Sequence, residues 1–178
     1  MRMTRSSRPI YTTVHALWAG FVLFVAGATF AQVMGPEAEL ERLRAKAEEA
    51  VGNDDPDGAA LNMGRAALMA KQLGKAQKHD PQMVRLYEGA EPLFRSQEHG
   101  YRAMALFRRA GGQLPASSGV CGSLALAHGS VQQALSTLKP LSEEPVLPTI
   151  LDRAKQLRGV ADDWVVVLAS MISDYQCP

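Results

Sequence analysis

Between residues 36 and 175, apolar residues recur every three or four positions in a succession of separate segments. Short stretches rich in glycine, proline or aspartate separate these segments. Val/Ile-rich alternating runs, which would indicate strands, are nearly absent; alanine is abundant and aromatic residues make up 6% of the chain. The 178 residues suffice for one domain of ordinary size. The sequence therefore predicts an all-α fold of packed helices.

The breaks set the bounds of the predicted helices. These cover residues 35–51, 58–78, 81–96, 101–110, 118–127, 130–139, 148–158 and 161–175. Asp80 and Pro81 have the pattern of a helix N-cap followed by proline at the first helical position. Pro92 is expected to bend or divide the third helix, and residues 139–148 to form a proline-rich linker. The acidic stretch 52–58 lacks the later ligands of an EF-hand, which predicts a turn and helix N-cap there.

The predicted helices present apolar faces that supply the core candidates. These are Leu40, Leu43, Ala47, Val51, Leu61, Leu68, Met69, Leu73, Met83, Leu86, Tyr87, Ala90 and Phe94.

Residues 1–31 have the three parts of a secretory signal: a basic start, an uncharged apolar stretch and an end in small residues. The apolar stretch is Ala16–Ala28, and cleavage is expected after Ala31, with Ala28 as a second candidate site. An uncleaved membrane anchor is the alternative, because no charged residue lies between Arg8 and Glu37. In both cases the rest of the chain is expected outside the cytoplasm. It would be periplasmic or secreted after cleavage, or membrane-anchored and facing the periplasm.

The charge of the chain excludes one class of partner. The full sequence carries a formal charge of +1, which becomes −2 once Arg2, Arg5 and Arg8 of the signal are removed. A chain this close to neutral lacks the clustered basic face that nucleic-acid binding usually requires. The adjacent Arg108 and Arg109 are interpreted as a solvated helix edge, not as a phosphate site.

The two cysteines, Cys121 and Cys177, have no CxxC or CxxCH neighbour. In an exported protein, two such cysteines predict one disulfide, which would close a loop of about 57 residues. It would fasten the C-terminal helix to the middle of the domain. Two unpaired buried thiols are the alternative.

The second and fourth predicted helices share one spacing of residues. Met69, Leu73, Ala76 and Pro81 recur 34 residues later as Ala103, Phe107, Ala110 and Pro115. Two small residues on one face of a helix let a neighbouring helix approach closely, and the large residue between them fills the gap. This pattern resembles the tetratricopeptide (TPR) repeat, a helix-turn-helix unit of 34 residues, with residues 84–117 as its best match.

Within that unit, Tyr87 and Phe94 take the aromatic positions of the first helix, while Ala90, Glu91 and Glu98 depart from the usual residues. A second match, after a shortened turn, comprises Cys121, Gly122, Ala125, Gly129, Val131, Ala134 and Leu138. The resemblance implies helix-turn-helix repeats stacked as a short TPR-like solenoid; a plain helical bundle is the alternative. The predicted organisation is a signal peptide or retained anchor at 1–31, an N-terminal helix and turn at 32–57, TPR-like repeats at 58–142 and C-terminal capping helices at 143–178.

In TPR proteins the first helix of each unit lines a concave face. The resemblance therefore implies a partner-binding groove lined by Arg85, Glu88, Pro92, Arg95, Ser96, Ser123, Leu126 and Ala127. Arg85 and Arg95 could bind carboxylates of a partner. Solvated surface arginines are the alternative for both.

The residue patterns of common active sites are missing. His79, His99 and His128 lie in predicted turns, and none forms an i, i+4 pair with another ligand, so no metal site is expected. The sequence has no GxSxG motif and no glycine-rich phosphate loop. We therefore expect no catalytic residues, no cofactor and no enzymatic activity.

These features predict an exported, non-catalytic protein-protein interaction module in the cell envelope, which binds another protein or a peptide segment. The alternative is a structural accessory subunit of a larger membrane or envelope complex, held by an uncleaved N-terminal helix. Nucleic acid is not an expected partner, and membrane contact is expected only if the N-terminal helix is retained.

Overall fold

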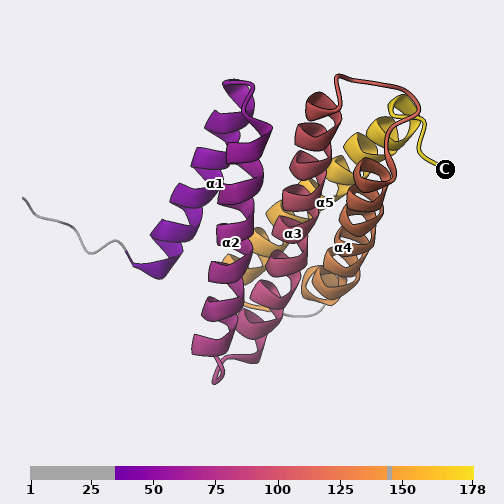
Figure 1. Ribbon diagram of the computed structural model, residues 1–178. Helices are drawn as coiled ribbons and strands as arrows, with labels where there is room; N and C mark the ends of the chain where they lie inside the picture. The colour runs from indigo at the N-terminus through magenta and orange to yellow at the C-terminus, as the bar shows by residue number, and fades with distance from the viewer. Residues whose placement is uncertain (1–34, 144–145) are drawn as a thin grey trace, which may run out of the picture. The chain divides into compact units, whose positions relative to one another are not determined.

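A computed structural model describes residues 35–143 and 146–178 of the chain, which fold as helices α1 to α5 without a strand in these ranges (Figure 1). Their bounds are α1 Pro36–Gly52, α2 Pro56–Ala76, α3 Pro81–Arg109, α4 Ser118–Glu143 and α5 Pro148–Asp174. The all-α prediction is confirmed. The predicted signal at 1–31 lies outside the described residues.

Each helix packs against the next one along the chain, and α5 also packs against α3, behind which it passes in Figure 1. The larger hydrophobic cluster takes side chains from all five helices. A smaller cluster joins α3, α4 and α5 through Leu86, Leu138, Leu141, Ile150 and Ala154. None of the described helices has both the length and the hydrophobicity needed to cross a bilayer.

Small residues explain how closely these helices pack. Ala47, Ala59, Ala66 and Ala70 are fully buried between α1, α2 and α3. Alanine has high helix propensity and a short side chain, so an alanine-lined face allows close helix packing. The abundance of alanine thus reflects the spacing between helices as well as helix propensity.

Aspartate caps begin two of the helices. The Asp80 carboxylate accepts hydrogen bonds from the backbone N–H groups of Gln82 and Met83 at 3.0 and 3.1 Å, and Pro81 follows it. Asp55 accepts from the Gly58 N–H at 2.8 Å at the start of α2. The predicted N-cap at residue 80 and the predicted turn and N-cap at 52–58 are confirmed.

The predicted breaks at residues 97–100, 128–129 and 159–160 are wrong, because α3, α4 and α5 run through them. Gln97, Glu98 and Gly100 are buried by neighbouring helices in the middle of α3. Packing stabilises a helix across residues of weak intrinsic propensity. For the same reason Pro92 does not divide α3, and the first part of the expected linker, residues 139–143, belongs to α4.

The expected repeat unit at 84–117 therefore does not contain its turn: residues 84–109 form one helix. In the second match, Val131, Ala134 and Leu138 are buried, but a Cβ at Gly122 or Gly129 would meet nothing within 4 Å. Those two glycines do not mediate a close helix contact. The structure supports five packed helices, without the predicted hairpin in this unit.

Three core predictions are also wrong, since Val51, Leu61 and Leu68 are exposed. Alanine and methionine residues of α2, among them Ala59, Met63, Ala66 and Ala70, form its buried face, and this leaves Leu61 and Leu68 on the outer face. Eight of the other core candidates are buried as expected. These are Leu40, Leu43, Ala47, Leu73, Leu86, Tyr87, Ala90 and Phe94.

The predicted disulfide is confirmed: Cys121 of α4 is bonded to Cys177, with their Cα atoms 5.4 Å apart. Two further contacts hold the same end of the chain. The Tyr175 ring stacks on Phe107 with centroids 4.1 Å apart, and the Ala116 N–H donates to the Tyr175 carbonyl at 2.9 Å. The residues after α5 are thereby fastened to the segment that joins α3 and α4.

Candidate partner-binding groove

A groove runs along the outer face of α2 and α3, which we call the α2–α3 groove. The two helices are antiparallel: Gly74 faces Tyr87 near the turn at 77–80, and Gly64 faces Glu98 further along. One line of lining residues, which we call the α2 wall, comprises Asp57, Leu61, Gly64, Leu68, Lys71, Lys75 and Lys78; Ala60, Arg65, Ala70 and Gly74 of α2 also line the groove. The α3 wall comprises Val84, Glu88, Glu91, Arg95, Glu98, Arg102, Leu106 and Arg109.

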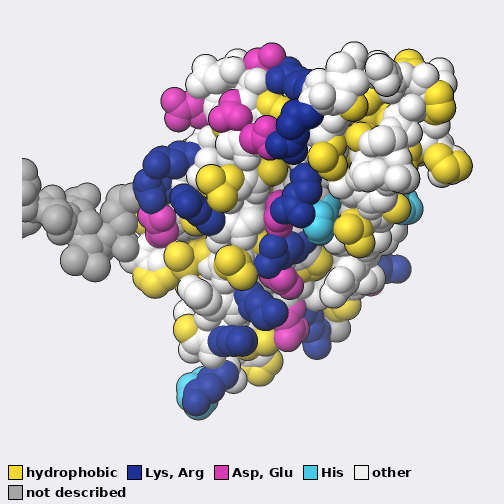
Figure 2. Space-filling view, in the orientation of Figure 1, with side chains coloured by type: hydrophobic (Ala, Val, Ile, Leu, Met, Phe, Trp, Pro, Cys, Tyr) yellow, Lys and Arg dark blue, Asp and Glu magenta, His cyan; other side chains and the backbone are white. Residues whose placement is uncertain are grey.

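Successive members of each wall are three or four residues apart, so each wall forms one line along its helix. The two hollows described below therefore follow one another along α2 and α3. In Figure 2, Lys and Arg side chains form a column over α2 and α3, with acidic side chains between them.

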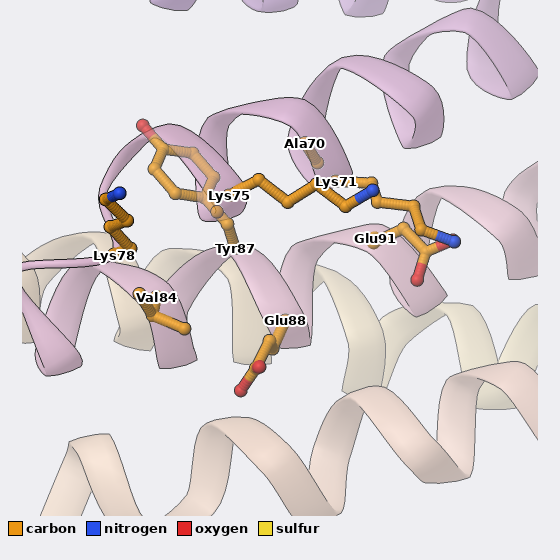
Figure 3. Close-up of a pocket in the computed structure, with 9 residues that line it drawn as sticks. Ala70, Lys71, Lys75, Lys78, Val84, Tyr87, Glu88 and Glu91 are labelled. Carbon is orange, nitrogen blue, oxygen red and sulfur yellow. The ribbon is translucent and has the colours of Figure 1, made fainter.

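The end of the groove near residues 77–80 holds a hollow of about 430 Å³. Lys71 and Lys75 reach it from α2 and Lys78 from the turn that follows, while Glu88 and Glu91 reach it from α3 (Figure 3). Ala70, Gly74, Val84 and Tyr87 also line it. This end thus combines an apolar lining with a row of three ammonium groups.

The other part of the groove holds a hollow of about 450 Å³ with a more apolar α2 wall. Leu61 and Leu68 are 56% and 51% exposed there, and Leu106 lines the hollow from α3. Two leucines seven residues apart lie on the same line of a helix. The chain therefore presents a short apolar stripe to solvent beside charged residues.

A chain of ion pairs fixes the α3 wall. Glu98 is buried, and its carboxylate accepts from Arg95 at 2.7 Å and from Arg102 at 2.5 Å. Glu91 also lies 3.5 Å from Arg95, and Arg109 lies 3.5 Å from Asp57 of α2. A Cβ at Gly64 would lie 3.1 Å from the Glu98 carboxyl carbon, so the glycine leaves room for this carboxylate. The buried Glu98 carboxylate thereby holds Arg95 and Arg102 along the groove.

Tyr87 connects the groove to α1 and α5. Its hydroxyl donates to Glu37 of α1 at 2.7 Å, and the Arg153 guanidinium of α5 lies 5.9 Å from the ring centroid. Burial, helped by the hydrogen bond to Glu37, raises the pKa of Tyr87 to about 12. Because this folded-state pKa lies above the ordinary value of 10.0, the contribution of the neutral hydroxyl to stability is complete below pH 10 and is lost as the pH rises through about 12.

The structure separates the residues that the sequence assigned to one groove. Glu88 and Arg95 lie on the α3 wall, whereas Arg85 is exposed on α3 outside both hollows. Ser96 is fully buried and donates to the Ala127 carbonyl of α4 at 2.7 Å, so it holds α3 against α4 and cannot contact a partner. Ser123 is also buried, and Leu126 is exposed on α4.

The sequence reasoning missed the α2 wall. From Gly58 to His79 the chain contains Arg65, Lys71, Lys75 and Lys78 but no acidic residue, and that bias was a readable signal. Leu61 and Leu68 were expected in the core, but alanine and methionine residues occupy the buried face of α2.

Within 35–143 and 146–178, no group of three or more His, Cys, Asp or Glu side chains could hold a metal ion.

The Arg108 side chain contacts Asp54, and Arg109 contacts Asp57. These two arginines thus connect the end of α3 to the α1–α2 turn and the start of α2.

The sequence and the structure were compared with known proteins. No protein-family model, curated protein or solved structure showed significant similarity to this chain.

Proposed function

We propose that this chain is an exported, non-catalytic protein-interaction module of the cell envelope and that the α2–α3 groove receives a segment of its partner. The observation that carries the proposal is the exposure of Leu61 and Leu68 beside a fixed row of charged side chains. Apolar surface rimmed by charge is typical of interaction sites. Burial of the two leucines would supply binding energy, and the charges would supply selectivity.

Two features support the location. Residues 1–31 have the composition of a secretory signal. The Cys121–Cys177 bond is typical of an oxidising compartment, where disulfides form and persist.

The stacking of each helix on the next supports a helical scaffold of the repeat type. The α2–α3 hairpin, joined by the turn at 77–80, would act as its binding unit. This unit differs in register from the TPR unit expected at 84–117.

The experiment compares two double variants in co-purification from the native source. Leu61→Ser/Leu68→Ser is expected to reduce partner recovery by about tenfold or more, because two buried leucines would be lost from the interface. The matched control Leu126→Ser/Val166→Ser removes two apolar side chains that are at least as exposed, from α4 and α5. It is expected to leave recovery unchanged. Equal recovery with both variants would contradict the proposal.

A further inference from the structure

We propose that the occupant of the α2–α3 groove is an amphipathic helix of the partner protein, acidic at the end that meets Lys71, Lys75 and Lys78 and apolar where it meets Leu61, Leu68 and Leu106. This inference rests on the proposed function and names the chemistry of the partner.

The geometry of the groove suits a helix. Its two walls are antiparallel helices whose lining residues follow a three-four spacing. A third helix can pack into such a groove with residues at i, i+3, i+4 and i+7. From Asp57 to Lys78 the α2 wall extends about 30 Å, which matches a partner helix of about 20 residues.

The charge of the groove changes along its length. At the end near residues 77–80 the α2 wall carries three lysines, and the facing acids are Glu88 and Glu91. Glu91 already forms an ion pair with Arg95. In the other part, Glu98 is balanced by Arg95 and Arg102, and Asp57 by Arg109, while Arg65 adds one further positive charge against the three lysines of the first part. The lysine end therefore favours acidic residues of a partner, and the leucine part favours apolar ones.

Segments of the same chain fit less well. Residues 1–34 carry Arg2, Arg5 and Arg8 and no acid, so their charge does not complement the lysines. Helix α1 is acidic and amphipathic, but its Leu40, Leu43 and Ala47 are already buried in the core. An anionic membrane surface is a separate occupant, which the vesicle measurement below distinguishes from a peptide.

The test uses synthetic helical peptides of about 20 residues with leucines seven residues apart and three glutamates at one end. Two versions place the glutamates at the N-terminal or the C-terminal end, since the groove could take a helix in either direction. Control peptides carry lysine for glutamate or serine for leucine. Binding to the full mature chain is measured by fluorescence anisotropy, and sedimentation with phosphatidylglycerol vesicles is measured in parallel.

We expect one of the two acidic peptides to bind. The variant Lys71→Glu/Lys75→Glu/Lys78→Glu should lower the affinity for that peptide by about tenfold or more. The triple variant should bind the lysine peptide instead. All three lysines are exposed, so the variant should fold, and circular dichroism would verify this. The matched control Lys46→Glu/Lys155→Glu reverses exposed charges on α1 and α5 and should leave binding unchanged.

The inference is overturned if neither acidic peptide binds, or if the triple variant binds an acidic peptide as well as the wild-type protein does. It is also overturned if the lysines are needed for binding to vesicles and not for binding to peptides. These failures are distinct from failure of the proposed function. If Leu61→Ser/Leu68→Ser still loses the native partner while no acidic peptide binds, the groove binds a partner of different chemistry. If the leucine variant keeps its partner, the proposed function itself is wrong.

Discussion

Removal of the Cys121–Cys177 disulfide is expected to lower the free energy of unfolding by about 4 kcal/mol. The bond joins residues 56 positions apart, so it restricts a long stretch of the unfolded chain. A loss of this size is a large part of the 5–15 kcal/mol that is typical of folded domains. Without the bond, the stacking of Tyr175 on Phe107 would be weaker, because no covalent link would hold the C-terminal residues in place.

Urea unfolding of Cys121→Ala/Cys177→Ala measures this effect. The wild-type protein in reductant should match the variant, and reductant should not change the variant further. Unchanged stability in the variant would show that the unfolded chain gains little freedom from loss of the bond.

Alanine at two glycine positions of α3 is expected to destabilise the protein, although alanine is the better helix former. A Cβ at Gly89 would lie 2.5 Å from Leu138 Cδ2, and a Cβ at Gly100 would lie 2.6 Å from Trp164 Cζ2. Leu138 is fully buried, and the Trp164 ring packs edge-on against Tyr101, so neither neighbour can swing away. Gly89→Ala or Gly100→Ala should cost a net of about 1–2 kcal/mol, after about 1 kcal/mol is regained from helix propensity.

Matched controls exist in α4 and α5. A Cβ at Gly129 or Gly159 meets nothing within 4 Å, so Gly129→Ala and Gly159→Ala should stabilise the protein by up to about 1 kcal/mol. Thermal and urea unfolding of the four variants give the comparison. If all four substitutions shift stability in the same direction, the close α3–α4 and α3–α5 contacts are not as described.

Local signals in the sequence were sufficient for part of the fold. The N-cap at Asp80, the face of Leu40 and Leu43, and the pairing of Cys121 with Cys177 each depend on residues whose role is visible without the neighbours. The continuity of α3 was not visible, because Glu98 and Gly100 are weak helix signals until Arg95, Arg102 and Trp164 pack around them. Tertiary contacts decide such segments.

The residues of the candidate site could also be predicted only in part. Glu88 and Arg95 were predicted as binding residues and lie on the α3 wall of the groove. Ser96 was predicted with them but packs into α4, because it points about 100° around the helix axis from its neighbour Arg95. Leu61 and Leu68 could not be assigned to the surface without knowledge of which α2 face the alanines occupy.

The central claim is that the α2–α3 groove is the surface that a partner occupies. Its most direct test places a photo-crosslinking amino acid at position 68 in the groove or at position 126 on α4 in the native cell. The two leucines there are similarly exposed, at 51% and 59%, so accessibility alone should not distinguish them. We expect a discrete adduct with one partner protein from position 68 and none from position 126. No adduct from position 68, or the same adducts from both positions, would contradict the claim.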